Sequence, residues 1–336
     1  MIPKPPSEVV ELAAARAAAR DRRDWAEADR LRVRLEAGGW RVVDDGVGYA
    51  LAPAHPADVA VAGRLYHGWS GSVPSRLEDP AVGVVTLLVV GEPDATARTI
   101  AALGADRLAD AQVVLVGAGR DAEALDRQLA SVPVHPEDRG DLDEVVLMAE
   151  PPSLGAALDA GIRRSASPVV IVLPDGLTPS ADGLSALVRA LDDPVVGVAG
   201  LHGLATSDLR HIGEVASAAI AVELAGMTFR RADYVARGPL DARLRTPMYV
   251  SLWWSLALRD EGEGIAPRRA VVVGAGADRR PDATAAVGGD DGRERDRPGR
   301  RDYYRLLDRF RDRPDLLVAE DARGSDGPRT GRPTRP

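Results

Sequence analysis

The sequence predicts an α/β protein with a doubly wound, mostly parallel sheet that is preceded by a small helical hairpin. Between residues 82 and 201, short apolar runs alternate with stretches of helical periodicity. This alternation is typical of buried parallel strands covered by helices on both faces. Residues 1–52 have a different pattern, in which apolar residues recur at helical spacing. With 336 residues, the chain is long enough for about two domains of roughly 150 residues each.

The N-terminal module, residues 1–52, begins with two predicted antiparallel helices. Apolar residues recur at helical spacing in two stretches, and Asp24 precedes the second stretch while Gly38-Gly39 ends it. Aspartate is a favoured N-cap and glycine a favoured helix terminator. We expect Trp25 and the leucines to hold the two helices together. Two short extended segments around a turn are expected between residues 40 and 51.

One residue pattern in this module is shared with a known family. The residues that carry it are Ala19, Arg20, Asp24, Trp25, Ala28, Asp29, Leu31, Arg32, Leu35, Gly39, Val42 and Asp44. With them the module resembles the small C-terminal region of cysteinyl-tRNA synthetases. The catalytic portion of those enzymes has no counterpart here, so the resemblance indicates a fold more than a function. Contact with RNA through the hairpin is an alternative that rests on analogy alone.

The remaining chain divides by composition. Residues 53–80 are rich in Pro, Gly, His and Ser, which predicts a linker, and residues 81–276 form the α/β domain. Its expected strands are 84–90, 112–116, 144–148, 168–173 and 195–201, and its expected helices are 94–103, 121–130, 153–165 and 180–191. Residues 277–300 are almost all Asp, Arg, Gly, Ala and Pro, which predicts disorder. Residues 301–318 are expected to form a helix that docks on the body, and 319–336 a disordered tail.

Composition excludes several classes of protein. The chain has 45% hydrophobic residues, 28% charged residues and no cysteine, which argues against overall disorder, a disulfide-stapled scaffold and cysteine metal sites. Because the net charge is −8, we expect no nucleic acid partner. No apolar run approaches the roughly 20 residues of a transmembrane segment, and residues 1–7 do not resemble a signal peptide. We expect a cytoplasmic protein; peripheral attachment to a membrane stays open.

Three predicted strands end in turns that should lie on one rim of the sheet. Glu92 follows the first strand, Gly117 and Gly119 follow the second, and Asp175 follows the fourth. In open α/β sheets, ligands bind beyond the carboxyl ends of the strands. The Gly117-x-Gly119 pair is a weak signal by itself, because it lacks the third glycine of a dinucleotide-binding motif. Asp175 lies in Pro-Asp-Gly, which is also an ordinary turn sequence.

Five segments agree in order and spacing with a known family of enzymes. They are 84–90, 112–120, the helix Leu154-Gly155-x-Ala157-x-x-Ala160-Gly161, the strand 169–173 with Pro174-Asp175-Gly176, and the block 226–231 with 238–241, which 253–259 continues. Across residues 82 to about 273 the chain therefore resembles family 2 glycosyltransferases. The resemblance implies a GT-A fold, a nucleoside-diphosphate sugar as donor, Mg²⁺ or Mn²⁺ as cofactor, and transfer of a hexose with inversion to a glycan or lipid-linked acceptor.

The resemblance also implies roles for individual residues. Asp175 would hold the metal and the diphosphate, and one carboxylate can suffice because Mg²⁺ commonly uses only one or two. Glu92, Gly117 and Gly119 would lie near the nucleoside. Arg230 and Arg231 would meet a diphosphate or an anionic acceptor, or would pair with Asp233 and Asp241. Trp253 suits stacking on a sugar, although core packing is the favoured interpretation.

Three polar residues of the family pattern are missing. Leu173 replaces the first polar residue of the metal loop, residues 116–119 offer no acid to contact the base, and residues 249–252 contain no acid to take the acceptor's proton. The displaced candidates for that catalytic base are Asp241 and Asp260. Each also has a structural explanation, Asp241 as a cap and Asp260 on a solvated helix face. The sequence thus supports a hexosyltransferase or, as the alternative, a catalytically inactive GT-A scaffold that serves as an interaction protein.

Overall fold

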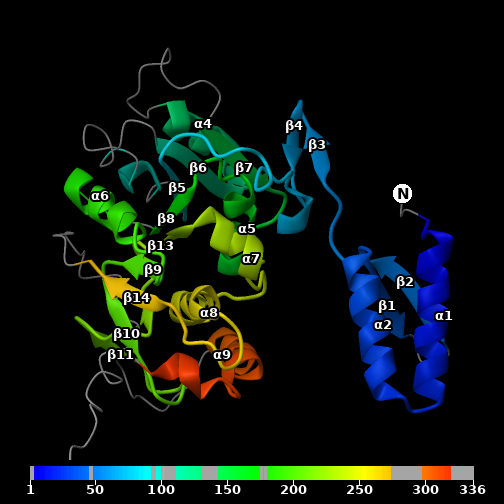
Figure 1. Cartoon of the computed structure of the whole chain (residues 1–336). Helices are drawn as coiled ribbons and strands as arrows, with labels where there is room; N and C mark the ends of the chain where they lie inside the picture. The colour runs from blue at the N-terminus through cyan, green and yellow to red at the C-terminus, as the bar shows by residue number, and fades with distance from the viewer. Residues whose placement is uncertain are drawn as a thin grey trace, which may run out of the picture. The chain divides into compact units, whose positions relative to one another are not determined.

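A computed structural model of the chain describes residues 4–44, 48–91, 96–99, 101, 111–130, 143–174, 177, 180–273 and 297–318. The chain divides into two compact units, Met1–Trp69 and Ser70–Pro336, and most of their helices and strands are labelled in Figure 1. Glu92, Asp175, 274–296 and 319–336 lie outside the described residues. The disorder expected for 277–296 and 319–336 therefore concerns residues outside the described ones, whereas residues 297–300 are helical, contrary to the disorder expected for them. Within the described part of the chain, every helix is too short or too polar to cross a bilayer.

The first unit contains the predicted helical hairpin and strand pair. Helices α1 (Ser7–Asp21) and α2 (Trp25–Ala37) pack together, and strands β1 (Trp40–Asp44) and β2 (Tyr49–Pro53) pair antiparallel. The Asp24 carboxylate accepts a hydrogen bond of 3.1 Å from the Glu27 N–H. This is the predicted N-cap of α2, so the local signals at this helix start are confirmed.

The tryptophan that packs the first unit is Trp40 and not the predicted Trp25. Trp25 is the first residue of α2, beside the turn, and its side chain is 59% exposed. Trp40 is 7% exposed and forms a buried cluster with Val9, Ala13 and Leu35. The physical reason is position, because a residue in the first turn of α2 lies at the end of the helix pair, whereas β1 lies against its buried side.

The segment expected as a linker contains secondary structure. Strands β3 (Val59–Val61) and β4 (Arg64–Tyr66) form an antiparallel hairpin. Ala62 and Gly63 both have positive φ, which suits a two-residue hairpin turn. The short helix η1 (Ser70–Ser72) opens the second unit, where Val73 is 1% exposed in the core. The division between the compact units therefore falls at Trp69, inside the range 53–80.

The second unit is built on a seven-stranded, mostly parallel sheet (Figure 1). Its strands are β5 (Val85–Val90), β6 (Ala111–Ala118), β7 (Glu144–Met148), β8 (Val169–Pro174), β9 (Val196–Gly200), β13 (Thr228–Arg230) and β14 (Arg269–Val272). Their order is β14-β9-β13-β8-β5-β6-β7. Strand β13 is antiparallel to both of its neighbours, and the other pairs are parallel. The predicted fold class is confirmed.

Helices cover both faces of this sheet, as a doubly wound arrangement requires. A Cβ on Gly161 of α5 (Leu154–Arg163) would overlap Leu88 and Val116, so α5 packs on that face. A Cβ on Gly117 would overlap Leu125 of α4 (Ala122–Ala130). Because successive residues of a strand point to opposite faces, α4 and α5 lie on opposite sides of β6.

The remaining elements complete the second unit. They are η2 (Gly119–Asp121), α6 (Ala181–Ala190), α7 (Arg231–Arg237), α8 (Pro247–Arg259), α9 (Arg297–Phe310), η5 (Pro314–Leu317) and a small sheet of β10 (Gly203–Ala205), β11 (Gly213–Val215) and β12 (Ala221–Val222). Of the helix expected at 94–103, the residues 96–99 and 101 are described and are helical. The segment expected to dock does pack on α8, with Leu306 and Phe310 buried. It begins at Arg297, earlier than expected, because Pro298 is tolerated in the first turn of a helix.

Candidate functional site

The carboxyl ends of β5, β6 and β8 meet at one edge of the sheet, which we call the rim. In the parallel register, Val90 of β5 lies beside Val116 of β6 and beside Pro174 of β8. The chain continues from these strands toward Glu92 and Asp175, which are not among the described residues. The arrangement of strand ends expected from the sequence is therefore present. The metal role of Asp175 and the nucleoside role of Glu92 stay predictions.

The two glycines at the end of β6 have different structural reasons. Gly117 lies within β6, where the close approach of Leu125 leaves no space for a Cβ. Gly119 is the first residue of η2, in the turn that leaves the rim. Packing of α4 thus explains Gly117 without a ligand, whereas Gly119 occupies the position at which a turn could approach a nucleoside.

Asp241 is held by two arginines. Its carboxylate accepts hydrogen bonds of 2.9 and 3.0 Å from the Arg243 guanidinium and one of 3.0 Å from the Arg243 N–H. Arg305 lies 3.4 Å away. Burial alone would raise the pKa of the Asp241 carboxyl, but the bonds and charge of Arg243, with the charge of Arg305, outweigh it and lower the pKa. In this arrangement Asp241 is a weak proton acceptor.

Asp260, the other candidate base, lies at the opposite end of α8 from the segment that carries Asp241. It is the C-terminal cap residue of α8, a helix about 18 Å long at 1.5 Å per residue. Its carboxylate accepts hydrogen bonds from Arg313 at 2.6 Å and from the Gly262 N–H at 2.9 Å. These bonds tie together the chain after α8 and the segment after α9, so a structural role accounts for Asp260.

Arg230 and Arg231 lie at the edge of the sheet opposite the rim. Arg230 pairs with Val169, the first residue of β8, whereas the rim is at Pro174. Five residue steps of a strand span about 16 Å, which is more than an arginine side chain can reach. Neither guanidinium can therefore contact a diphosphate bound at the rim.

Backbone carbonyls occupy both of these guanidinium groups. Arg230 donates to Val196 O at 2.7 Å and lies 3.4 Å from the Asp233 carboxylate. Arg231 donates to Asp79 O at 2.7 Å and to Ser165 O at 3.2 Å, and burial lowers its pKa. The pairing alternative holds for Arg230 with Asp233, and both arginines join segments at the amino ends of the strands.

Trp253 belongs to the core. It is 4% exposed, its ring packs at 6.1 Å edge-on against Phe310, and the Arg309 guanidinium lies 4.3 Å from the ring centroid. The ring of Trp253 is thus used in packing α9 on α8. Stacking on a sugar would require an exposed ring face. Trp253 therefore has the core-packing role in this structure.

A concave surface rich in arginine lies between the chain before α8 and the helix α9. We call it the arginine concavity, and it has a volume of about 570 Å³. Its lining includes Ser153 at the start of α5, Asp302, and the four arginines Arg243, Arg245, Arg301 and Arg305. Sequence reasoning missed this site. Two signals could have indicated it, namely the spacing Arg243-x-Arg245 and the i, i+4 pair Arg301 and Arg305, which share one face of a helix.

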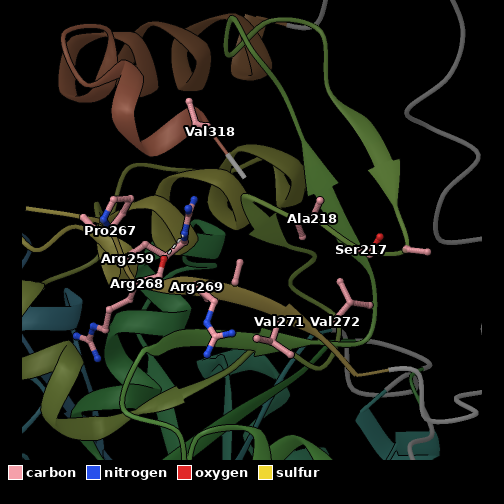
Figure 2. A pocket seen from close by; sticks show the side chains of 13 residues that line it. Ser217, Ala218, Arg259, Pro267, Arg268, Arg269, Val271, Val272 and Val318 are labelled. Carbon is pink, nitrogen blue, oxygen red and sulfur yellow. Dashed lines mark hydrogen bonds between the residues drawn. The ribbon is translucent and has the colours of Figure 1, made fainter. Parts of the chain in front are cut away.

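A second pocket lies beside the edge strand β14 (Figure 2). It has a volume of about 260 Å³ and is lined in part by Ser217, Arg259 and Arg268. Arg259 donates to the carbonyls of Ile220 and Arg268, the latter drawn as a dashed line in Figure 2. In the strand order, β9, β13 and β8 separate β14 from β5, so this pocket is remote from the rim. The guanidinium groups of Arg259 and Arg268 already make hydrogen bonds that stabilise the fold.

The described residues contain no group of three or more His, Asp or Glu side chains that could hold a metal ion. The donor set that the sequence offers for Mg²⁺ or Mn²⁺ is the single carboxylate of Asp175, which lies outside the described residues. Hard cations of this kind can be held by one or two carboxylates when phosphate oxygens complete the shell. The chemistry of the donor therefore fits, with the substrate supplying the other ligands.

No family model and no curated protein matches the chain. Among solved structures, it is similar to the mannosyltransferase PcManGT from Pyrobaculum calidifontis in complex with GDP-Man and Mn²⁺, with 17% identity, a TM-score of 0.42, and coverage of 61% of this chain and 57% of that chain. It is also similar to GalNAc-T7 with UDP, GalNAc and Mn²⁺, with 13% identity, a TM-score of 0.49, and coverage of 69% and 50%.

A third similar structure is S. aureus TarS 1-349, with 8% identity, a TM-score of 0.38, and coverage of 52% of this chain and 55% of that chain. The chain thus spans about half the length of the solved chains that it matches. Similarity at this level does not transfer an activity, a sugar or a metal to this chain.

Proposed function

We propose that the chain binds a nucleoside-diphosphate sugar at the rim and transfers the sugar, with inversion, to a glycan or lipid-linked acceptor. The observation that carries this proposal is the register that sets Val90 beside both Val116 and Pro174. It brings together the three strand ends that precede Glu92, Gly119 and Asp175. Ligands of open α/β sheets bind at such an edge. Membership of family 2 and the likeness of residues 1–52 to cysteinyl-tRNA synthetases are parts of the same proposal.

On this proposal, Asp175 holds Mg²⁺ or Mn²⁺, and the cation neutralises the diphosphate leaving group. The role of Asp175 is to orient the donor at the end of β8, and Gly119 permits the nucleoside to approach the turn after β6. The composition leads us to place this activity in the cytoplasm.

The acceptor side is proposed to be the segment that carries Asp241. Its carboxylate would take the proton of an acceptor hydroxyl once Arg243, whose side chain is 70% exposed, had moved away. That movement would also relieve the lowering of the Asp241 pKa. Asp260 is the weaker candidate, since the bond from Arg313 ties it to the C-terminal segment.

Binding without turnover is the second candidate function. The observation that favours it is that arginines engage both candidate bases. In that case the second unit is a scaffold, and the N-terminal hairpin supplies the contact with a partner. The exposed indole of Trp25 suits such a contact.

Thermal unfolding in the presence of UDP- and GDP-sugars, with Mg²⁺ or Mn²⁺, tests donor binding. A donor at 100 times its dissociation constant stabilises the folded state by about 2.7 kcal/mol, so we expect a clear rise in Tm with at least one donor. The Asp175→Ala variant should lose that rise. The matched control is Asp192→Ala, since Asp192 is exposed and precedes β9 at the opposite edge of the sheet. No rise in Tm with any donor would overturn the proposal.

Turnover is tested separately by release of the nucleoside diphosphate from a donor that binds, with the sugar passing either to water or to an added glycan or phosphate-ester acceptor. Transfer with Asp241 as base predicts release by the wild-type chain and its loss in Asp241→Asn, with the donor-induced rise in Tm retained. A rise in Tm without release above background, either in water or with each added acceptor, would instead support binding without turnover.

A further inference from the structure

The arginine concavity collects positive charge from two distant parts of the sequence. Arg243 and Arg245 precede α8, whereas Arg301 and Arg305 lie one turn apart on α9. The whole chain carries a net charge of −8, so a surface with four guanidinium groups is a local exception. Like charges held close together repel unless an anion lies among them.

The carboxylates at this surface offset only part of that charge. Asp302 is 1% exposed, and it accepts hydrogen bonds from the N–H groups of Arg245 at 2.9 Å and Thr246 at 2.8 Å. Asp241 is the partner of Arg243 and Arg305. Among the residues that the structure describes, no carboxylate pairs with the guanidinium of Arg245 or of Arg301, and both residues are exposed. Two guanidinium groups are therefore available to a ligand.

The position of the concavity relates it to the rim. Arg164, which follows α5, binds Glu144 at the start of β7 through bonds of 2.5 and 2.9 Å. The other end of α5, where Ser153 lines the concavity, therefore lies toward the carboxyl end of β7. Met148 at that end lies beside Ala118 of β6. The concavity thus lies toward the same edge of the sheet as the proposed donor site.

We propose that the arginine concavity binds a phosphate group carried by the acceptor, an inference that rests on the proposed transfer function. A phosphate presents several oxygens around one centre, and arginines from two separate elements can each donate a pair of hydrogen bonds to it. An uncharged sugar would leave the guanidinium charges unmatched. The acceptor is therefore a phosphate ester or diphosphate, either soluble or carried by a lipid.

Isothermal titration of the full chain with pyrophosphate tests this site. The titration is done in EDTA at constant ionic strength, so that metal-dependent binding at the rim does not contribute. We expect saturable binding to the wild-type chain and at least a tenfold weaker affinity for the double variant Arg245→Gln/Arg301→Gln. The matched control is Arg311→Gln, because Arg311 is 65% exposed, lies just after α9 and does not line the concavity. Its affinity should stay within twofold of wild type.

Two results would overturn the inference. One is the absence of saturable binding to the wild-type chain, and the other is an equal loss of affinity in the double variant and the control. Far-ultraviolet circular dichroism confirms that the variants are folded. If the double variant does not fold, the single variants Arg245→Gln and Arg301→Gln should each weaken binding at least threefold, and unchanged affinity in both would contradict the site.

Sedimentation with vesicles distinguishes the two sources of the phosphate. Vesicles of phosphatidylcholine with phosphatidic acid are compared with phosphatidylcholine alone. Sedimentation with the first that is lost in the double variant supports a lipid-borne phosphate, whereas pyrophosphate binding without sedimentation supports a soluble one. The Asp175→Ala variant should retain pyrophosphate binding in EDTA. Failure of the donor site and failure of the concavity are thus separate outcomes.

Discussion

The backbone of Gly155 lies directly against the carbonyl oxygen of Asp241, so closely that a Cβ on Gly155 would overlap it. The Gly155 N–H donates a hydrogen bond of 2.9 Å to Leu244 O, and the Ser153 hydroxyl donates one to Ala242 O. The start of α5 therefore holds the segment that brings Asp241 to the candidate acceptor side.

Replacing Gly155 by alanine should destabilise the chain and disturb this segment. The new methyl group meets backbone, which cannot rotate away, and inserting a methyl group into a closely packed site typically costs about 1–3 kcal/mol. Urea unfolding should show that loss for Gly155→Ala. The matched control is Gly213→Ala in β11, where no atom lies within 4 Å of the added Cβ, and its unfolding free energy should change by less than about 0.5 kcal/mol. Equal effects in the two variants would contradict the close approach.

Arg259 should be a structural residue whose loss frees the C-terminal segment. It is 2% exposed and donates to the carbonyls of Ile220 at 2.7 Å, Leu316 at 2.9 Å and Arg268 at 2.6 Å. Replacement by methionine keeps much of the volume but leaves these buried carbonyls without their donor, at a cost of about 1–3 kcal/mol for each group left unsatisfied. Urea unfolding should show a loss in unfolding free energy of at least about 2 kcal/mol, which is the cost expected when about two such carbonyls lose their donor.

The control for Arg259 is Arg311→Met. Arg311 is exposed and pairs only weakly with exposed Asp312, at 3.4 Å, so its replacement should change the unfolding free energy by less than about 0.5 kcal/mol. Limited proteolysis provides a second measurement, since cleavage near Leu316 should accelerate in Arg259→Met alone. Unchanged stability and cleavage would show that the buried guanidinium does not hold η5.

Trp253 should contribute to stability and not to donor binding. Replacing a buried tryptophan by alanine typically costs about 3–5 kcal/mol, and we expect a loss in this range for Trp253→Ala. The control Trp25→Ala, with a 59% exposed side chain, should lose less than about 1 kcal/mol. In both Trp253→Ala and Trp25→Ala, the donor-induced rise in Tm, measured from each variant's own Tm, should be the same as in wild type. A specific loss of that rise in Trp253→Leu would restore the sugar-stacking interpretation.

The stabilising contribution of Asp241 should disappear in acid. The pKa of Asp241 is lowered in the folded chain from the usual aspartate value of about 3.9, so the folded state favours the ionised form. This contribution is complete above the unfolded pKa and is lost as the pH falls through the lower folded pKa. The difference in unfolding free energy between wild type and Asp241→Asn should be constant from pH 8 to about pH 6 and shrink below about pH 4.

Urea unfolding at pH 7, 5, 4 and 3 measures this dependence. The control is Asp308→Asn on the exposed face of α9, whose unfolding free energy should stay close to that of wild type at each pH. A difference for Asp241→Asn that grows as the pH falls would mean that Asp241 is protonated in the folded chain, contrary to its two arginine partners.

Much of the fold could be predicted from the sequence because burial leaves a local record. The apolar runs at 84–90 and 112–116 correspond to strands that are buried on both faces, with α4 and α5 on opposite sides of β6. The apolar face of α9 likewise indicated a helix packed on the body. Periodicity and capping signals depend on neighbours in sequence, so they can be read without the tertiary structure.

The candidate site could be predicted only in part, because direction and pairing are not local. The rim followed from the ends of parallel strands. The diphosphate role that the family resemblance implied for Arg230 does not fit the structure, because β13 runs antiparallel and ends at the opposite edge of the sheet. The packing role predicted for Trp25 was wrong for a related reason, since helical spacing does not say which end of a helix lies outside the core.

By itself, the sequence determined the α/β class, the helical hairpin, and the carboxylates and glycines that follow the strands. Only the tertiary structure decided which charges meet. Arg243 and Arg305 share the Asp241 carboxylate, while Arg245 and Arg301 are left without one among the described residues. The reason is that packing of α9 on α8, together with the contact between Gly155 and Asp241, brings these groups together across the chain. Electrostatic interactions depend on those distances in space and not on separation in sequence.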